Sequence, residues 1–503
     1  MLDGGGRLVA GADRPDRPHQ AGQVHDAVVV GGGVAGLVAA RELALAGLRP
    51  LVLEAWRAPG GVVGRHEVDG LLLDAGAESF ATRGGVVAAL ADELGLTDRV
   101  VTPEPHGAWV RLPHGAGPLP RTGLLGIPAD PWAPDVRRTL GTVGSLRAAL
   151  DRVLPASVGL RAEVPTLGGL VRARMGARVL DRLVRPVVAG VHAAEPDDVA
   201  ADAVAPGLAA AVRREGSLAG AVAAMRALAP AGSAVAGFRG GLHVLVDALA
   251  SDVEARGGVV RTGTPVVAVE RTDGMFHVTV TGGADGTGGA DGPEVLRARR
   301  LVVATPRAVD LLAGVAPDLA GLHTDPGADI VLVTLVLDAP ELDSAPRGTG
   351  VLVARGVQGV RAKALTHATA KWGWLAEAAG PGRHVVRLSY GRAGDDAGDP
   401  LPRDLGALTD LALRDAAAVL GVPLTSAQVR AAARVPWSQG LPVPSAAHRR
   451  TVQQVRAAVA EVPGLAVVGA WVSGNGLASV VPDARATAAA VAAVGAPAAP
   501  DAP

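Results

Sequence analysis

The sequence contains no cysteine. This absence excludes disulfide bonds, thiolate metal sites, iron–sulfur clusters, a cysteine nucleophile and a cofactor linked through a cysteinyl sulfur. A net charge of only -1 argues against a nucleic-acid-binding protein, which needs a dense basic surface. No run of about 18 strongly apolar residues occurs, so a membrane-spanning helix is not expected. We therefore expect no structural disulfides, no nucleic-acid partner and no transmembrane segment.

Several other residue types are rare. Lysine occurs only at Lys363 and Lys371, asparagine only at Asn475 and tyrosine only at Tyr390. Alanine, glycine, valine, leucine, arginine and proline dominate instead, which is typical of a chain encoded by a GC-rich genome. A rare residue that persists in such a chain indicates a position that needs its side chain, although chance survival is an open alternative.

The length of 503 residues, of which 49% are hydrophobic, predicts a globular protein of two to four domains at roughly 100–200 residues per domain. Residues 1–24 lack the apolar segment of a signal peptide and predict a flexible extension. Residues 493–503 predict a flexible tail. These features favour a cytoplasmic protein, with peripheral membrane contact and oligomeric state left open.

The first chemical signal is the string VVVGGGVAGL, in which Gly31, Gly33 and Gly36 form a GxGxxG motif. The motif follows the apolar strand HDAVVV and opens a helix over 34–46 that ends at Gly47, as dinucleotide binding requires. The first glycine permits a tight turn, the second lets backbone approach a pyrophosphate, and the third lets helix and strand pack closely. The helix N-terminus adds amide donors and partial positive charge for phosphates.

Glu54 adds to this motif. It follows Gly36 by 18 residues, at the end of the next predicted strand over 50–54, where a carboxylate can bind ribose hydroxyls. A lone GxGxxG is a weak signal, but strand, helix and carboxylate together predict a bound ADP-containing dinucleotide. A tight strand-to-helix turn without a ligand is the alternative.

Three further segments favour FAD over NAD. Gly60 and Gly61 permit backbone to approach a second part of the cofactor, and the string LLLDAGAESF places small residues around Gly76. The closing string VVGAWVSGNGLASVV is another glycine-rich strand-to-helix turn. A helix N-terminus there can face a flavin ring and stabilise negative charge on its reduced form. Separate segments that meet one long cofactor are what FAD needs.

The pattern along the chain predicts an α/β fold whose FAD-binding Rossmann-like domain is built from discontinuous segments. We expect these segments at 25–95, 232–310 and 460–492, because a nucleotide-binding motif opens the chain and a second strand, glycine turn and helix close it. Helical periodicity predicts a mainly helical insertion at 96–231. Strand-rich sequence predicts a mixed-sheet substrate-binding domain at 311–459.

Together these strings resemble the FAD-dependent protoporphyrinogen and coproporphyrinogen oxidases of bacterial haem synthesis, within the wider amine-oxidase-like flavoprotein superfamily. The superfamily resemblance rests on GGGVAGL, LEAWRAPGG, DAGAESF, FRGGLHVLVDAL, VVATP and GAWVSGNG. The narrower one rests on GAESFATRGGVVAALADELGL, LPRTGLLGIPAD, LVRPVVAGVHAAEPDDVAADAVAP and AKALTHATAKWGWL. It covers essentially residues 25–491. The chain departs from the family pattern at Val62, where many relatives have a basic residue, and at His192, where they have tyrosine.

The resemblance implies a non-covalently bound FAD, a porphyrinogen substrate and O2 as electron acceptor, with release of hydrogen peroxide. Formation of the porphyrin removes six electrons, which implies three cycles of the flavin. The resemblance together with the GC-rich composition favours coproporphyrinogen III over protoporphyrinogen IX. Because aromatisation drives the reaction, we assign no catalytic residue, and His192 is more readily explained as a structural residue than as a general base.

The candidate site residues follow from the motifs and the resemblance. The residues predicted to contact FAD are Gly31, Gly32, Gly33, Val34, Ala35, Gly36, Glu54, Ala55, Gly60, Gly61, Gly76, Ala77, Glu78, Ser79, Val267, Trp437, Gly474, Asn475, Gly476 and Leu477. The candidates for binding substrate carboxylates, which pair with cations, are Lys363, His367, Lys371 and His448. Solvated or purely structural positions are the alternative for these four, and no metal site is predicted.

Three other functions stay open. An FAD-dependent amine oxidase typically frames its amine with aromatic rings, and a chain with one tyrosine and three phenylalanines would have to use tryptophan. A desaturase suits a more apolar cavity with access for lipids. A flavin- or porphyrin-binding protein without turnover is the third alternative.

Overall fold

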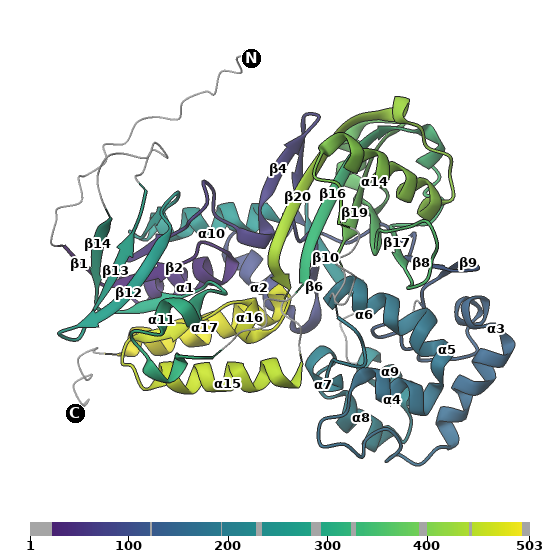
Figure 1. Cartoon of the computed structure of the whole chain (residues 1–503), viewed down its shortest axis with the longest axis horizontal. Coiled ribbons are helices and arrows are strands. Elements are labelled where there is room, and N and C mark those ends of the chain that lie inside the picture. The colour runs from purple at the N-terminus through teal and green to yellow at the C-terminus, as the bar shows by residue number, and fades with distance from the viewer. Residues whose placement is uncertain are drawn as a thin grey trace.

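The computed structural model describes residues 23–120, 123–192, 194–227, 234–282, 293–322, 328–391, 400–441 and 445–494. The predicted N-terminal extension and C-terminal tail lie outside these ranges, except for two residues of each. Figure 1 shows three parts: a layered α/β part, a second sheet with its own covering helix, and a group of short helices.

The layered part is built on a five-stranded parallel sheet in the order β11-β3-β2-β15-β21. Its strands are β2 (Ala27–Val30), β3 (Pro50–Leu53), β11 (Val259–Arg261), β15 (Leu301–Val303) and β21 (Leu465–Val467). All but β11 are buried along their whole length, which explains why the sequence shows continuous apolar runs there. Strands from the beginning, middle and end of the chain share one sheet, which confirms the predicted α/β fold with a discontinuous Rossmann-like domain.

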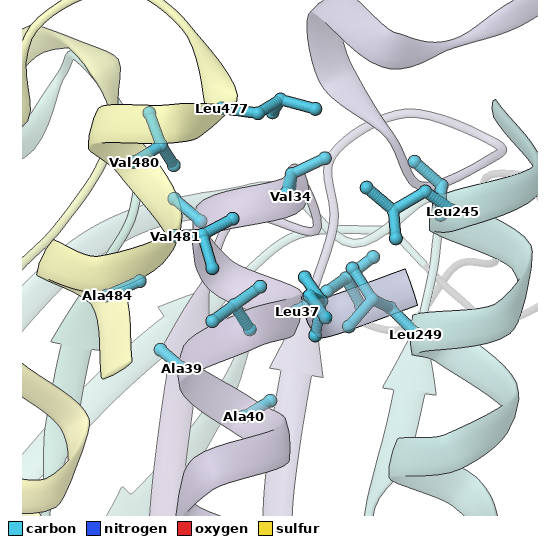
Figure 2. Close-up of a cluster of buried hydrophobic side chains, with 14 of the residues drawn as sticks. Val34, Leu37, Ala39, Ala40, Leu245, Leu249, Leu477, Val480, Val481 and Ala484 are labelled. Atoms are coloured by element: carbon cyan, nitrogen blue, oxygen red, sulfur yellow. The ribbon is translucent and has the colours of Figure 1, made fainter. Parts of the chain in front are cut away.

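Three helices cover one face of this sheet: α1 (Val34–Leu45), α10 (His243–Ala255) and α17 (Leu477–Ala493). They share one apolar core, in which Figure 2 shows Leu37 of α1 beside Leu249 of α10, and Val481 of α17 close to α1. Helix α1 ends before Gly47, whose φ of 84° suits glycine and stops the helix. The core fixes α1 and α17 relative to each other, so the turns that precede them are fixed as well.

The opposite face carries a second, smaller sheet and two helices. The strands are β1 (Val24–His25), β12 (Val266–Thr272), β13 (Met275–Val280) and β14 (Glu294–Ala298), and the helices are α11 (Ala308–Leu312) and α15 (Ala446–Ala460). Helix α15, except for its last residue, falls in the range 311–459 that the sequence assigns to the substrate-binding domain. The structure differs, because Val455 and Val459 of α15 pack in the same core as Val28. Periodicity shows that a helix has an apolar face, but not which sheet that face covers.

The second part is a seven-stranded sheet in the order β20-β16-β19-β18-β17-β8-β9. Its strands are β8 (Trp109–Leu112), β9 (Gly115–Pro118), β16 (Ala328–Asp338), β17 (Gly350–Val353), β18 (Ala364–His367), β19 (Arg383–Tyr390) and β20 (Val429–Leu441). Helix α14 (Leu405–Leu420) packs on one face. β8 and β9 lie within 96–231, predicted as mainly helical, yet β8 pairs in parallel with β17. The insertion therefore gives β8 and β9 to the neighbouring sheet before it becomes helical.

The third part is the helical insertion itself (Figure 1). Its helices are α3 (Pro134–Ala149), α4 (Leu167–Met175), α5 (Ala177–Val179), α6 (Arg185–His192), α7 (Ala201–Val204), α8 (Leu208–Glu215) and α9 (Leu218–Ala227). They enclose a separate apolar core, at whose edge Arg174 and Asp151 form a fully buried ion pair. In none of the described ranges is there a helix with the length and apolar character needed to cross a membrane.

Candidate cofactor and substrate site

The first glycine turn adopts the geometry that the motif predicts. Gly31 has a φ of 105°, a backbone conformation that favours glycine. A Cβ added at Gly36 would lie 1.9 Å from the carbonyl oxygen of Gly31, a distance at which the two atoms would overlap. Glycine at position 36 is therefore what lets α1 start directly against the turn.

Gly33, the second glycine of the motif, has open space where a side chain would lie. A Cβ at Gly33 would meet only the carbonyl oxygen of Gly60, at 3.9 Å. Gly33 and Gly60 form a parallel bridge, and the Gly60 N–H donates to the Gly32 carbonyl at 2.9 Å. The loop that contains Gly60 and Gly61 thus lies beside the N-terminus of α1, where peptide groups are not covered by side chains.

Glu54 follows β3 and is 6% exposed. Its Oε2 accepts a hydrogen bond from the backbone N–H of Gly32 at 2.7 Å, and its Oε1 accepts one from Trp56 at 2.9 Å. The carboxylate therefore lies at the glycine turn, where ribose hydroxyls are bound in a Rossmann-like site. Its neighbour Ala55 is exposed.

We expect Glu54→Gln to weaken FAD binding by roughly 10- to 100-fold, because a hydrogen bond to a charged acceptor contributes about 1.5–3 kcal/mol. Titration of FAD into the apoprotein, followed by quenching of flavin fluorescence, measures this. Glu270→Gln, at an exposed position of β12, serves as the control and should bind FAD like the wild type. Equal affinities for all three proteins would contradict a cofactor role for Glu54.

The second glycine-rich turn joins α16 (Ala470–Ser473) to α17. Gly474 and Gly476 have φ values of 91° and 105°, and a Cβ at either would have nothing within 4 Å. Leu477 and Val34, the first residues of α17 and α1, belong to one apolar core, and Figure 2 shows the two helices beginning side by side. Two helix N-termini therefore direct backbone amides to one region. Asn475 lies between the two glycines, partly exposed.

The turn 75–79 connects β5 (Leu71–Asp74) to β6 (Phe80–Ala81). Side chains of the seven-stranded sheet donate hydrogen bonds to it. Gly76 has no room for a side chain, since a Cβ there would lie 2.2 Å from the Val62 carbonyl oxygen and 3.2 Å from the Trp437 ring. The Trp437 indole Nε1 donates to the Ala75 carbonyl at 3.1 Å. The structure thus brings the predicted residues Gly76 and Trp437 together, although they are far apart in the sequence.

Glu78, in the same turn, is held by two cations. Lys371, the last residue of α12 (Ala368–Lys371), donates from Nζ to Glu78 Oε1 at 2.7 Å, and Arg387 Nη2 lies 3.0 Å from Glu78 Oε2. Burial alone would raise the pKa of Glu78, but Arg387 and Lys371 outweigh it and lower the pKa to about 2. Lys371 is therefore paired with Glu78, 3.4 Å from the Ser79 hydroxyl; no substrate is needed to explain its burial.

The lowered pKa of Glu78 predicts a component of acid unfolding. The folded-state pKa of about 2 lies below the ordinary 4.5, so the unfolded chain binds the proton more readily between these values. The stabilisation, about 3 kcal/mol, is fully present above pH 4.5 and is lost as pH falls toward 2. We expect the gap in unfolding free energy between wild type and Glu78→Gln to shrink over this range, as measured by urea unfolding. Exposed Glu67→Gln is the control, and a pH-independent gap would contradict the assignment.

The remaining substrate candidates have other surroundings. Lys363 is buried next to β18, where its backbone N–H donates to Ser389. His367 is fully buried, and its Nε2 lies 3.0 Å from Nδ1 of His384. Burial and His384 lower the pKa of His367 to about 3, so this ring stays neutral and is not the carboxylate-binding cation that we predicted.

Two further predicted site residues are His448, a substrate candidate, and Val267, predicted to contact FAD. His448 lies in the first turn of α15 and its Nε2 donates to the carbonyl of Trp471 at 2.7 Å, beside the second glycine turn. Val267 lies at a break in the β12–β13 register and is 49% exposed. His192 is in α6, but its side chain is outside what the structure describes.

Arg387 and Asp74 are site residues that sequence reasoning missed. Arg387 Nη1 donates to the carbonyl oxygens of Gly76 at 2.7 Å and Asp74 at 3.2 Å. Asp74 Oδ1 accepts from the Leu242 N–H at 2.7 Å, just before α10. Two sequence signals could have identified these residues: Arg387 is a charged residue inside the apolar strand HVVRLSY, and Asp74 is a carboxylate that ends the apolar run LLLD.

These features fit an extended dinucleotide with a flavin ring. A Cβ at Gly33, Gly474 or Gly476 would meet nothing closer than 3.9 Å, so these positions of the two glycine turns leave peptide groups uncovered. Glu54 offers a buried carboxylate beside the first turn. The indole N–H of Trp471, next to the second turn, is buried and has no hydrogen-bond partner within the part of the chain that the structure describes. A bound group with acceptors for amide and indole donors would satisfy them.

Comparison with known proteins agrees with this geometry. A family model for flavin containing amine oxidoreductases matches residues 34–494. The chain is 31% identical to coproporphyrinogen III oxidase of Mycobacterium tuberculosis, over 90% of this chain and 94% of that protein. It is 25% identical to the enzyme of the same name from Bacillus subtilis, over 91% and 96% of the two chains. A crystal structure of a candidate protoporphyrinogen oxidase from Exiguobacterium sp. 255-15 superposes with a TM-score of 0.76 at 27% identity, covering 93% of this chain and 99% of that one.

Proposed function

The chain belongs to the family of flavin-containing amine oxidoreductases, and on this basis we propose that it oxidises coproporphyrinogen III to coproporphyrin III. It is an oxidoreductase with FAD as cofactor. In the proposed reaction the substrate loses six hydrogen atoms, and three molecules of O2 are reduced to three of hydrogen peroxide. Protoporphyrinogen IX is the second candidate substrate.

The observation that carries the proposal is similarity over nearly the full length to relatives named coproporphyrinogen III oxidase. The family match over residues 34–494 spans all three parts of the chain except for β1 and β2. A relative that is 29% identical over 51% of this chain, the chloroplastic enzyme of Oryza sativa, is named protoporphyrinogen oxidase. Full-length similarity therefore favours coproporphyrinogen III, and the shorter similarity provides the alternative.

The residues of the chain have binding and positioning roles in this mechanism. Backbone amides at the starts of α1 and α17 would hold the phosphates and the flavin, and Glu54 would hold the ribose. FAD, when bound, supplies the hydride acceptor that the reaction needs. Trp437 and Arg387 fix the turn 75–79 from the substrate-side sheet, which would keep substrate and cofactor in one orientation. Aromatisation drives the oxidation, so no side chain is assigned as a strong base.

A surface hollow of about 490 Å³ beside the helical insertion is a poor match for this substrate. Its lining residues are Asp181, Arg185, Glu195, Asp197, Asp198 and Arg355. Four carboxylates against two guanidinium groups would repel a porphyrinogen that carries several propionates. We therefore do not place the substrate in this hollow.

Rates of porphyrin formation on the two porphyrinogens test the proposal, with peroxide measured in parallel. We expect faster turnover of coproporphyrinogen III and one peroxide per pair of electrons removed. Amine and polyene substrates are the controls for an amine oxidase and a desaturase. Under anaerobic conditions a porphyrinogen should bleach the flavin, and a yellow protein that no porphyrinogen bleaches would overturn the proposal in favour of binding without turnover.

We also propose peripheral contact with an anionic membrane surface through the helical insertion. Exposed apolar residues recur at helical spacing along α3 and the turn after it: Val143, Leu146, Leu150 and Val153. Exposed arginines flank them: Arg137, Arg138 and Arg152. An apolar stripe with basic neighbours suits the interface of anionic lipids.

Sedimentation with vesicles checks this contact. The protein should bind vesicles that contain phosphatidylserine and not vesicles of phosphatidylcholine alone, with release at high salt. Val153→Glu, at a position that is 77% exposed, should abolish binding, whereas Val295→Glu on β14 should not. Binding that is absent, or equal for both variants, would remove the proposal.

A further inference from the structure

One carboxylate and two cations are buried together where the turn 75–79 meets the seven-stranded sheet. Glu78 belongs to the turn, whereas Lys371 ends α12 and Arg387 belongs to β19. Their side chains are only 12–14% exposed. We call these three residues the Glu78 cluster. Since Glu78 stays ionised, the cluster carries one net positive charge.

The cluster is fixed to the turn that is predicted to contact FAD. Arg387 donates both to Glu78 and to the carbonyl of Gly76, so a single guanidinium holds the side chain and the backbone of the turn. Lys371 Nζ lies 5.0 Å from the centre of the Trp372 ring, and Trp372 is itself buried. Aromatic and backbone surroundings with little water screen charge weakly, so the field of the cluster reaches neighbouring groups.

We propose that the Glu78 cluster raises the reduction potential of the bound flavin by holding a positive charge beside its ring. Reduction adds two electrons and one proton to the neutral oxidised ring and leaves a negative charge on it, which a nearby cation stabilises. The inference rests on FAD as cofactor and on the predicted contact of residues 76–79 with it, and it requires that the flavin ring is the part of FAD that they contact. It extends the proposed function because it holds whatever substrate supplies the electrons.

Variants that change the charge of the cluster by one unit test this. Lys371→Met makes the cluster neutral and should lower the midpoint potential, whereas Glu78→Gln makes it doubly positive and should raise the potential. We expect each to change the reduction equilibrium at least tenfold, which is about 30 mV for a two-electron couple. The double variant restores one positive charge and should return close to the wild-type potential. Anaerobic titration of the FAD-loaded proteins against reference dyes measures these values at constant pH.

Opposite shifts of the midpoint potential in the two single variants distinguish a charge effect from loss of structure. Loss of structure would shift the potential of both variants in the same direction. Lys371→Arg keeps the charge and should keep the potential. Arg256→Met removes a cation at an exposed position after α10 and should change nothing. Shifts of equal sign, or no shift in any variant that retains the flavin absorbance, would overturn the proposal. If Lys371→Met loses the flavin, Glu78→Gln and the double variant decide. The potentials can be measured even if the protein oxidises no porphyrinogen. The proposed function and the proposed effect of the Glu78 cluster can therefore fail separately.

Discussion

Replacement of Gly36 by alanine should give a protein that is purified without yellow colour. The added Cβ would lie 1.9 Å from the Gly31 carbonyl oxygen and 3.2 Å from Cβ of Ala304, so it would meet backbone as well as side chain. Overpacking of a well-packed core typically costs about 1–3 kcal/mol, and the Gly31 backbone on one side of the new Cβ leaves little freedom to relax. Helix α1 must therefore move away from β2 and β15, and its amides move away from the phosphates.

We expect FAD affinity to fall by at least ~100-fold in Gly36→Ala, since uniform misplacement of a phosphate-binding helix N-terminus removes several charge-assisted hydrogen bonds of about 1.5–3 kcal/mol each. The ratio of flavin absorbance to protein absorbance after reconstitution measures the loss. Gly314→Ala is the matched control, because its Cβ would have only the Val269 carbonyl oxygen nearby, at 3.8 Å. Retention of stoichiometric flavin by Gly36→Ala would refute this account of the turn.

Asp151→Ala should have the largest effect on stability. Asp151 accepts from Arg174 Nε at 2.5 Å and from the backbone N–H groups of Leu218 and Ala219 at 3.0 and 2.8 Å, at the start of α9. Both charged side chains are completely buried. Removal of Asp151 leaves the Arg174 guanidinium without a counter-ion and the N–H groups of Leu218 and Ala219 without their acceptor, which typically costs about 3–5 kcal/mol.

The measurement is the unfolding free energy in urea, read from tryptophan fluorescence. Arg172→Met is a matched control, because Arg172 is half exposed in its ion pair with Asp197 and exposed pairs contribute about 0–1 kcal/mol. A loss of stability for Asp151→Ala no greater than that of Arg172→Met would show that the buried pair is dispensable. Loss of the insertion core with retention of flavin would show that the two parts unfold separately.

The glycine turns were predictable because their determinants are local. Strand, turn and helix around Gly31 and Gly36 lie within one short stretch, and the sequence spacing alone places Glu54 at the end of the next strand. The turn at Gly476 was found by the same reasoning, since α17 follows it directly.

The pairing of Glu78 with Lys371 and Arg387 could not be predicted in this way. Lys371 and Glu78 are 293 positions apart, and no local pattern records which side chains face each other across two sheets. His367 shows the same limit, since its even spacing from Lys363 suggested a shared face but not the burial beside His384 that lowers the pKa of its ring. The sequence of β8 likewise has the pattern of a strand, but it does not indicate that β17 is the strand with which β8 pairs.

The assembly of the cofactor-binding part from both ends of the chain has a consequence for biosynthesis. The ion pair between Glu93 and Arg485 of α17 joins positions 392 residues apart. At about 5–20 residues per second, the ribosome needs roughly 20–80 s to make the intervening chain. During that time the apolar side of α1 that packs against α17 in the finished protein is not covered by that helix. We therefore expect FAD to bind only after α17 has been made. A chain that stops before α17 would leave part of the apolar surface of α1 exposed and would lack the second helix N-terminus of the cofactor site.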